Sequence, residues 1–256
     1  MDLNVVTLTC PDRPGIVHAI TGGIVAAGGN ITELQQFSSP DSGLFFTRIQ
    51  VSGAGEQELR NAISVTTTGF GARLRVDDAT RPLRTLILAS KAGHAVNDLL
   101  FRWQSGDLPV DIVRIMANHQ VLAPMAEFYE VPFTSRVVTK ETKGEFEDEI
   151  RRVVEEESIE LVVLARYMQI LSPELCEFLA WRAINIHHSF LPGFKGAKPY
   201  HQAYNKGVKM VGATAHYINN DLDEGPIIAQ GVETVDHAHY PEDLIAKGRD
   251  IECLTL

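Results

Sequence analysis

Apolar and polar positions along the first 80 residues predict a set of short, alternating elements. β-branched segments predict strands, and apolar positions spaced three to four residues apart predict helices. The predicted strands are Leu3–Thr9, Asn30–Ser38, Leu44–Val51 and Ala72–Val76, and the predicted helices are Ile16–Ala27 and Glu56–Gly69. This β-α-β-β-α-β order is typical of an α+β, ferredoxin-like domain, which we place at residues 1–80.

A second pattern begins at Leu83, after a polar linker that contains Pro82. Strands and helices now alternate, and Leu161–Ala165 is a continuous apolar run, as expected for a central parallel strand buried on both faces. The predicted strands are Thr85–Ala89, Val110–Ala117, Phe133–Val137, Leu161–Ala165, Ala183–Ile186, Val211–Ile218 and Ile227–Val232, and the predicted helices are Val96–Gln104, Gln120–Tyr129, Lys143–Glu157 and Ser172–Leu179. The pattern predicts an α/β doubly wound, mostly parallel sheet of the Rossmann type over residues 83–256.

Composition and charge narrow the function. A net charge of -10 argues against nucleic acid as a partner, because binding to phosphates depends mainly on lysine and arginine. No apolar run approaches the roughly 20 residues that span a bilayer, and residues 1–10 show no secretory pattern. The three scattered cysteines suit a reducing compartment. We therefore expect a cytoplasmic protein that binds neither membrane nor nucleic acid.

The densest polar segment is NIHHS, which begins at the end of the predicted strand Ala183–Ile186. Because side chains alternate along a strand, Asn185 and His187 should share one face, with Ile186 in the core and His188 facing away. Ligands of doubly wound sheets bind beyond the carboxyl ends of the strands. An amide and an imidazole at this point therefore indicate a candidate active site, although a buried structural histidine with a capping asparagine would look the same. The irregular loop that follows, residues 191–196, is of the kind that lines a site.

A second polar segment, residues 219–226, joins the last two predicted strands. It holds Asp221, Asp223 and Glu224, and mutual repulsion among three carboxylates can raise a pKa toward that of a general base. A solvated turn would also explain these residue types. The spacing lacks the glycine and the distal glutamate of a calcium loop, and no HExxH zinc motif is present. We therefore expect no metal.

Two motifs, AINIHHSFLPGFKG at residues 183–196 and DLDEGPII at residues 221–228, resemble the folate-dependent formyltransferase family. The resemblance implies that Asn185, His187 and Asp223 act on the formyl group of 10-formyltetrahydrofolate. It also implies that a further histidine, His216, and the segment within LARYMQILSP bind the substrate. The pterin-binding residues of that segment would be Met168, Gln169, Ile170 and Leu171.

The first domain resembles the ACT domain through CPDRPG at residues 10–15 and GGNI at residues 28–31. ACT domains bind small amino acids and tend to pair, so the resemblance implies an amino-acid effector and a homo-oligomer. The candidate effector residues are Gly15, Ile16 and Asn30. An ordinary turn at the start of a helix or strand explains these three residues equally well.

An ACT domain ahead of a formyltransferase-like domain is similar to the members of the family that hydrolyse 10-formyltetrahydrofolate to formate and tetrahydrofolate. That reaction would supply formate for purine biosynthesis and balance the one-carbon folate pools. It would use water and no cofactor, because the folate is the substrate. The alternatives are formyl transfer to an amine such as glycinamide ribonucleotide, and a catalytically silent sensor. Family members usually continue beyond the position of Cys253 with a helix and a strand, so we expect a shorter end to affect folding or oligomer contacts rather than the motif residues.

Overall fold

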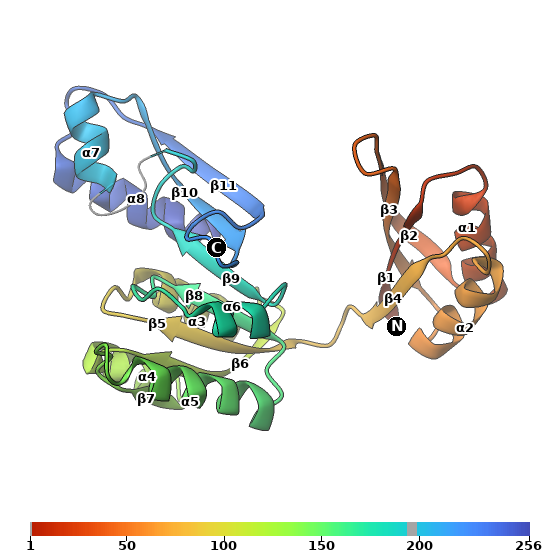
Figure 1. The fold of residues 1–256 in the computed structure, drawn as a ribbon, viewed down its shortest axis with the longest axis horizontal. Coiled ribbons are helices and arrows are strands. Elements are labelled where there is room, and N and C mark those ends of the chain that lie inside the picture. Colours follow the sequence, from red (N-terminus) through yellow and green to blue (C-terminus); the bar gives the residue numbers. More distant parts are fainter. Residues whose placement is uncertain (1, 194–198) are drawn as a thin grey trace. The chain divides into compact units, whose positions relative to one another are not determined.

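The computed structural model describes residues 2–193 and 199–256. The chain forms two compact units, Met1–Pro82 and Leu83–Leu256, each with its own core. The fold class expected from the sequence is confirmed: an α+β unit comes first and a mostly parallel α/β unit follows, as the ribbon in Figure 1 shows. The loop at residues 191–196 was expected to line the site, and its residues 194–196 lie outside the described part.

The first unit is a four-stranded antiparallel sheet in the order β2-β3-β1-β4. Alternate residues of β1, among them Val6 and Leu8, are buried against apolar positions of both helices. Figure 1 shows these helices together on one face of the sheet. The elements are β1 (Leu3–Pro11), α1 (Ile16–Ala26), β2 (Asn30–Ser39), β3 (Leu44–Ser52), α2 (Glu56–Thr66) and β4 (Arg73–Asp78).

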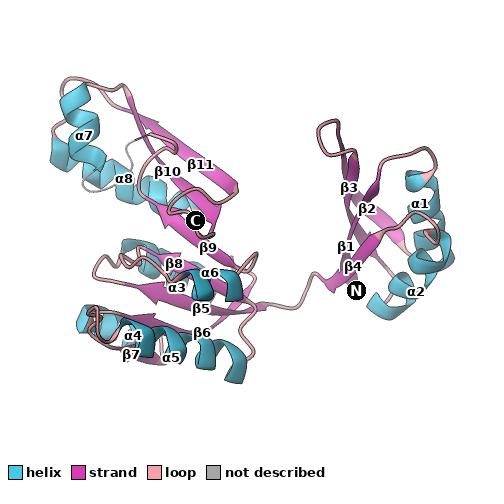
Figure 2. Cartoon of the chain, viewed as in Figure 1, coloured by secondary structure: helices cyan, strands magenta, loops and turns pink. Residues whose placement is uncertain are grey.

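The second unit is a seven-stranded sheet in the order β11-β10-β9-β8-β5-β6-β7. Strands β9-β8-β5-β6-β7 pair in parallel, while β10 is antiparallel to both β9 and β11. Helices separate most of these strands along the chain (Figure 2). The strands are β5 (Leu83–Ala89), β6 (Val110–Ala117), β7 (Phe133–Ser135), β8 (Leu161–Ala165), β9 (Ala183–His187), β10 (Met210–Tyr217) and β11 (Ile227–Thr234).

Helices occur between or after the strands of that sheet throughout the second unit. The expected helix at residues 120–129 begins as a short 3-10 turn, η1, and the helices α7 and α8 come from segments to which the sequence pattern assigned no element. The helical segments are α3 (His94–Gln104), η1 (Gln120–Leu122), α4 (Ala123–Phe128), α5 (Lys143–Glu156), α6 (Pro173–Phe178), α7 (Pro199–Lys206) and α8 (Pro241–Thr255).

Alternation along the central strands builds two cores, one on each face of this sheet. Leu86 and Leu88 of β5 pack with α5 and α6, whereas Ile87 and Ala89 pack with α3 and α4. Burial of each large aliphatic side chain contributes about 1.5–3 kcal/mol, so both faces hold β5 and β8 firmly in place. A third core lies where β9 and β10 meet α7 and α8. The carboxyl ends of β5, β8 and β9 are therefore fixed points from which a site can be built.

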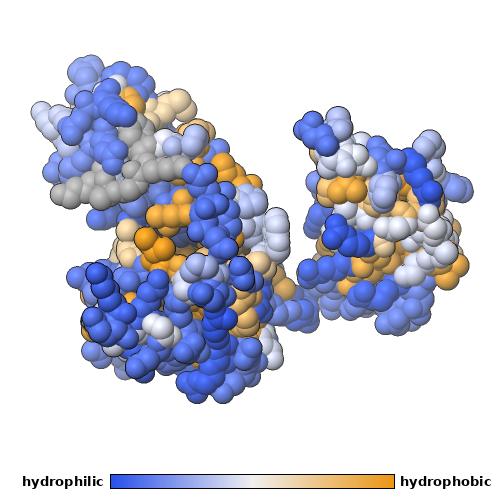
Figure 3. All heavy atoms as spheres, in the orientation of Figure 1, coloured by the Kyte–Doolittle hydropathy of each residue, from blue (hydrophilic) through white to orange (hydrophobic). Residues whose placement is uncertain are grey.

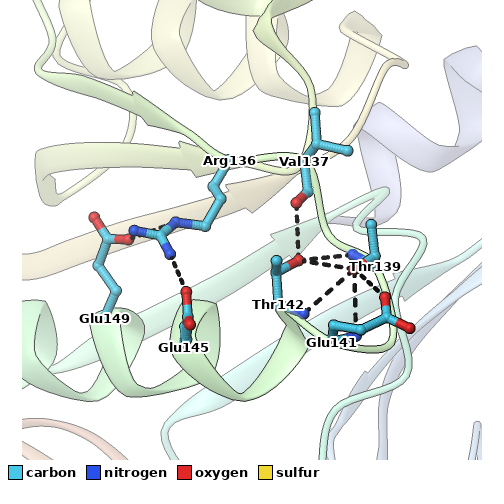
Figure 4. A network of polar contacts seen from close by, with 7 residues as sticks. All are labelled: Arg136, Val137, Thr139, Glu141, Thr142, Glu145 and Glu149. Carbon is cyan, nitrogen blue, oxygen red and sulfur yellow. Dashed lines mark hydrogen bonds and ion pairs between the residues drawn. The ribbon is translucent and has the colours of Figure 1, made fainter.

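Polar contacts fix the connection between β7 and α5 (Figure 4). Thr142, just before α5, donates its hydroxyl to the carbonyl of Val137 at 3.1 Å and accepts from the backbone N–H of Thr139 at 2.9 Å. Arg136 donates to Glu145 at 2.7 Å, and its Nε lies 3.6 Å from Glu149. These contacts hold the start of α5 against the end of β7.

Candidate active site

Strand pairing places Asn185 of β9 directly opposite His216 of β10. The amide Nδ2 of Asn185 lies 3.1 Å from Nε2 of His216. The other ring nitrogen of His216, Nδ1, lies 2.8 Å from the carbonyl oxygen of Tyr217. The amide of Asn185 carries two N–H groups, so one of them remains for a ligand beside the contact with His216. Because His216 is only 2% exposed, this arrangement is held inside the protein.

Asp223 reaches the same place from the loop between β10 and β11. Its Oδ1 lies 3.2 Å from Nδ1 of His187 and 3.7 Å from Nε2 of His216. Asp223 has a backbone φ of 58°, a left-handed conformation that aspartate and asparagine adopt more readily than most other residues. The structure thus brings Asn185, His187, His216 and Asp223 together, although they come from three separate segments.

The electrostatics of Asp223 differ from the expectation that neighbouring carboxylates raise its pKa. Burial does raise that pKa, but hydrogen bonds and charge interactions with His187 and His216 outweigh burial and hold it below its ordinary value of 3.8. The reason is geometric, because the side chain of Asp223 turns toward two imidazoles. Asp223 is therefore ionised at neutral pH, and its carboxylate faces Nδ1 of His187.

His187 presents one nitrogen to this site. The residue is 5% exposed, and its Nε2 is buried without a hydrogen-bond partner among the residues that the structure describes. Because Nδ1 faces Asp223, Nε2 is the nitrogen available to a ligand. A buried polar atom without a partner costs about 1–3 kcal/mol, so the site gains stability when a ligand atom pairs with it.

These side chains line a cavity of about 630 Å3, a volume typical of small-molecule sites. Within the second unit, Figure 3 shows apolar surface gathered between the β5–β8 part and the β10–β11 part, on a surface that is otherwise mostly hydrophilic. All four residues of the expected pterin segment, Met168, Gln169, Ile170 and Leu171, line the cavity, and Met168 and Ile170 are more than half exposed. An open apolar wall of this kind suits a flat ring system.

Hydrogen bonds at both ends hold the segment of residues 168–171 in place. The backbone N–H of Met168 donates to Oγ of Ser90, just beyond β5, at 2.8 Å. Ser172 caps α6 as expected, since its Oγ accepts from the N–H of Leu175 at 3.2 Å, and its own N–H donates to buried Glu147 at 3.0 Å. The segment is thereby tied at both ends to elements that the two cores fix.

Sequence reasoning missed several residues that line the same cavity. His188, expected to face away, has its ring 5.3 Å from that of His187. Burial, and after it the charges of Arg166 and His187, lowers the pKa of His188 to about 4, so this ring is neutral. Other polar residues that line the cavity and were not predicted as site residues include His94, Arg166, Tyr200, Arg249 and Glu252. Arg166 stands within the segment LARYMQILSP, but its own role was not indicated by the sequence.

The candidate effector residues do not meet within one chain. Gly15 has a φ of 97° and directly precedes α1, whereas Asn30 follows that helix at the start of β2. The 11 residues of α1 span about 16 Å, and Ile16 is only 2% exposed in the core of the first unit. Gly15 and Asn30 thus lie beyond opposite ends of α1.

Within residues 2–193 and 199–256, no group of three or more histidine, cysteine, aspartate or glutamate side chains is arranged to hold a metal ion. The helices of that same part include none with the length and apolar character required to cross a bilayer.

Comparison with known proteins gives the chain its class. Residues 83–256 match the formyl transferase family, and residues 4–65 match the ACT domain. The protein is thus a formyl transferase-type protein with an ACT domain ahead of that domain. Among solved structures, a phosphoribosylglycinamide formyltransferase from Anaplasma phagocytophilum is 31% identical, with a TM-score of 0.62, over 67% of this chain and 81% of its own.

Several relatives match both units, and two of them serve as examples. A formyltetrahydrofolate deformylase from Corynebacterium sp. (strain P-1) is 46% identical over 99% of this chain and 90% of its own length. The crystal structure of a formyltetrahydrofolate deformylase from Pseudomonas putida is 50% identical, with a TM-score of 0.91, over 99% of this chain and 92% of its own. The chain belongs to the formyltetrahydrofolate deformylase family.

Proposed function

We propose that this chain hydrolyses 10-formyltetrahydrofolate to formate and tetrahydrofolate, with Asn185, His187 and Asp223 as its catalytic residues. The observation that carries the proposal is the convergence of these three side chains in one cavity, beside the apolar wall of residues 168–171. The match to deformylases along both units supports the choice of substrate. The reaction would take place in the cytoplasm, supply formate for purine biosynthesis, and balance one-carbon folate pools.

The reaction adds water to the formyl carbon and breaks the bond between that carbon and the folate nitrogen. The water oxygen stays on the carbon and leaves as part of formate. One water proton ends on the folate nitrogen, and the other reaches solvent as formate ionises. Negative charge develops on the formyl oxygen when water adds, so donors aimed at that oxygen lower the barrier.

Asn185 and His187 are the donors in this proposal. Nε2 of His187 is buried and has no partner among the described residues, and Asn185 keeps one amide N–H beside the bond to His216. Each donor to a developing oxyanion contributes about 3–4 kcal/mol in comparable sites. His216 acts through Asn185 and holds its amide in place.

Asp223 places a negative charge beside Nδ1 of His187 and so holds the ring for its role as a donor. Its lowered pKa makes it a weak base, whereas a general base works best with a pKa near the working pH. We therefore assign Asp223 to holding His187 rather than to taking the proton of water. The distance of 3.2 Å between Oδ1 of Asp223 and Nδ1 of His187 is within the range of an ion pair.

The ACT unit, in this proposal, binds an amino acid and adjusts the activity of a homo-oligomer. The positions of Gly15 and Asn30 at opposite ends of α1 favour a site shared between two ACT units. A calorimetric titration with glycine and with methionine tests effector binding. The absence of a binding heat for these and other small amino acids would contradict it.

Formate release decides between hydrolysis and transfer. The purified protein is incubated with 10-formyltetrahydrofolate, with and without glycinamide ribonucleotide. We expect formate and tetrahydrofolate in equal amounts, at a rate that the amine does not change. Turnover only with the amine would indicate a transferase, and no turnover in either case would indicate a sensor.

A further inference from the structure

The lining of the cavity includes a group of polar side chains, called the polar arm below, that the proposed catalytic step does not use. It lies at residues that follow β5 and β8 and at residues of α7 and α8. The side chains that line it are His94, Arg166, Tyr200, Arg249 and Glu252. The attacking water does not need so many polar side chains, so we expect them to have another role.

Arg166 is the central residue of this arm. It directly follows β8 and has a φ of 61°, the left-handed region that side chains other than glycine, asparagine and aspartate rarely adopt. That conformation costs about 1–2 kcal/mol. Its side chain is only 16% exposed and lines the cavity. A strained, largely buried arginine is kept in place by the structure around it.

Glu252 of α8 organises that surrounding structure. Its Oε2 lies 2.7 Å from Nε2 of His94, and its Oε1 accepts from the hydroxyl of Tyr200 at 2.9 Å. Gly248, one turn earlier in α8, makes this packing possible, because a Cβ there would lie 2.1 Å from the Tyr200 hydroxyl oxygen. Glu252 is only 1% exposed, and these two neighbours hold it independently of Arg166.

Arg166 consequently keeps free donors. Its Nε lies 3.4 Å from Oε2 of Glu252, an ion-pair distance without a hydrogen bond. Both Nε and Nη1 are buried and have no hydrogen-bond partner among the residues that the structure describes. Buried N–H groups of a guanidinium favour a negatively charged acceptor, above all a carboxylate or phosphate.

The charges of the arm favour an anion, and its position favours a small one. Two arginines, Arg166 and Arg249, accompany a single carboxylate, Glu252, in the arm, so the arginines exceed the carboxylates by one positive charge. The ring of His188 lies 5.3 Å from that of His187 and 6.2 Å from that of Tyr200, so it connects the catalytic residues to this arm. An anion formed at His187 therefore has Arg166 within the same cavity.

We propose that Arg166 binds the formate that the reaction releases, and that the polar arm is the product site. This inference rests on the proposed hydrolysis, which produces one small carboxylate per turnover. Formate has only acceptor atoms, and one of its oxygens pairs with Nη1 of Arg166. Glu252 and Tyr200 position the arginine, and Arg249 lies exposed in the same arm.

Binding of 13C-labelled formate to the folate-free protein, followed by NMR, tests this directly. We expect saturable binding to the wild type and at least a tenfold weaker affinity in Arg166→Met, which corresponds to about 1.4 kcal/mol. Because Arg166→Met leaves Glu252 with less compensating charge, the double variant Arg166→Met/Glu252→Gln checks that the loss does not come from misfolding. Arg249→Met is the matched control, since it removes a positive charge from the same arm, and it should weaken binding less than Arg166→Met.

Three results would overturn the product site: no saturable binding to the wild type, wild-type affinity in both Arg166 variants, or full displacement of formate by an equal concentration of chloride. Formate should also inhibit hydrolysis by the wild type at concentrations at least ten times lower than it inhibits Arg166→Met. The two proposals fail separately. Formate binding at Arg166 without any hydrolysis would contradict the hydrolase, whereas hydrolysis with unchanged formate binding in Arg166→Met would contradict only the product site.

Discussion

Gly225 lies in the loop between β10 and β11 that carries Asp223, called the Asp223 loop below. A methyl group at this residue would collide with β10, against which the loop packs. Built on the backbone, a Cβ at residue 225 would lie 1.7 Å from the carbonyl oxygen of Tyr217 and 2.8 Å from its carbonyl carbon. Both are backbone atoms at the end of β10, so no side-chain rotation relieves the collision. The backbone N–H of Tyr217 also donates to the carbonyl of Pro226 at 2.9 Å, which ties loop and strand together at this point. Gly225→Ala must therefore move the loop.

The size of that movement follows from the contact. Ordinary van der Waals contact begins near 3.4 Å, so loop and strand must separate by about 1.7 Å. Asp223 is two residues away, and the same shift would carry its Oδ1 beyond ion-pair distance of His187, from the present 3.2 Å. A misplacement of about 1 Å can cost roughly 10²-fold in rate. We therefore expect kcat to fall by about 10²-fold or more, equivalent to about 2.7 kcal/mol, and stability to fall by about 1–3 kcal/mol.

Formate release under substrate saturation measures the first effect, and urea unfolding measures the second. Gly144→Ala is the matched control in the same unit. Residue 144 lies in α5, where a Cβ would meet no atom within 4 Å, and alanine should stabilise that helix by about 0.5–1 kcal/mol without changing kcat. If Gly225→Ala kept the wild-type rate, the close packing of the Asp223 loop would have no part in catalysis.

Three further predictions concern the groups around the site. His216→Gln should lower kcat about tenfold and leave folate affinity unchanged, because it disturbs the amide of Asn185 rather than residues 168–171. Steady-state kinetics and a folate titration measure the two effects, and a weaker folate affinity would indicate that His216 contacts the folate ring. Asp223 has a pKa below its ordinary 3.8, so its stabilising contribution is present above about pH 4 and is lost as pH falls through the lower folded value. The stability difference between wild type and Asp223→Asn, measured by urea unfolding, should accordingly shrink below pH 4, and a constant difference would count against the His187 contact. Gly248→Ala should destabilise the protein by about 1–3 kcal/mol through collision with Tyr200, and an unchanged melting temperature would refute that packing.

Much of the fold was predictable because its signals are local. Leu161–Ala165 appears in the structure as β8 with the predicted bounds, since a five-residue apolar run buried on both faces allows few other conformations. The segment of α8, by contrast, shows no simple apolar stripe. Glu252 and Gly248 occupy buried positions of that helix, one for a polar network and one for the ring of Tyr200. A glutamate and a glycine at buried positions interrupt the apolar pattern by which the helix could have been predicted.

The candidate catalytic residues were predictable to a smaller extent. Alternation along β9 indicated that Asn185 and His187 share a face, but only the tertiary structure shows that His216 meets Asn185 and that Asp223 meets His187. The direction of the Asp223 pKa shift could not be predicted from the sequence either, because it depends on which neighbours the side chain faces. Arg166 gave no periodic signal at all, since a single residue after a strand reveals neither its burial nor its backbone conformation.

The activity of Asp223→Asn is the sharpest test of the proposed catalytic role of this carboxylate. Asparagine tolerates the left-handed backbone at residue 223 and nearly matches aspartate in shape, so the substitution removes the charge with little strain. Formate release is measured in a single turnover beside folate affinity from a direct titration. We expect a rate at least about 10²-fold below the wild type with folate affinity within about threefold, as when a charge that stabilises the transition state is lost. A near-wild-type rate of formate release in Asp223→Asn would contradict that role.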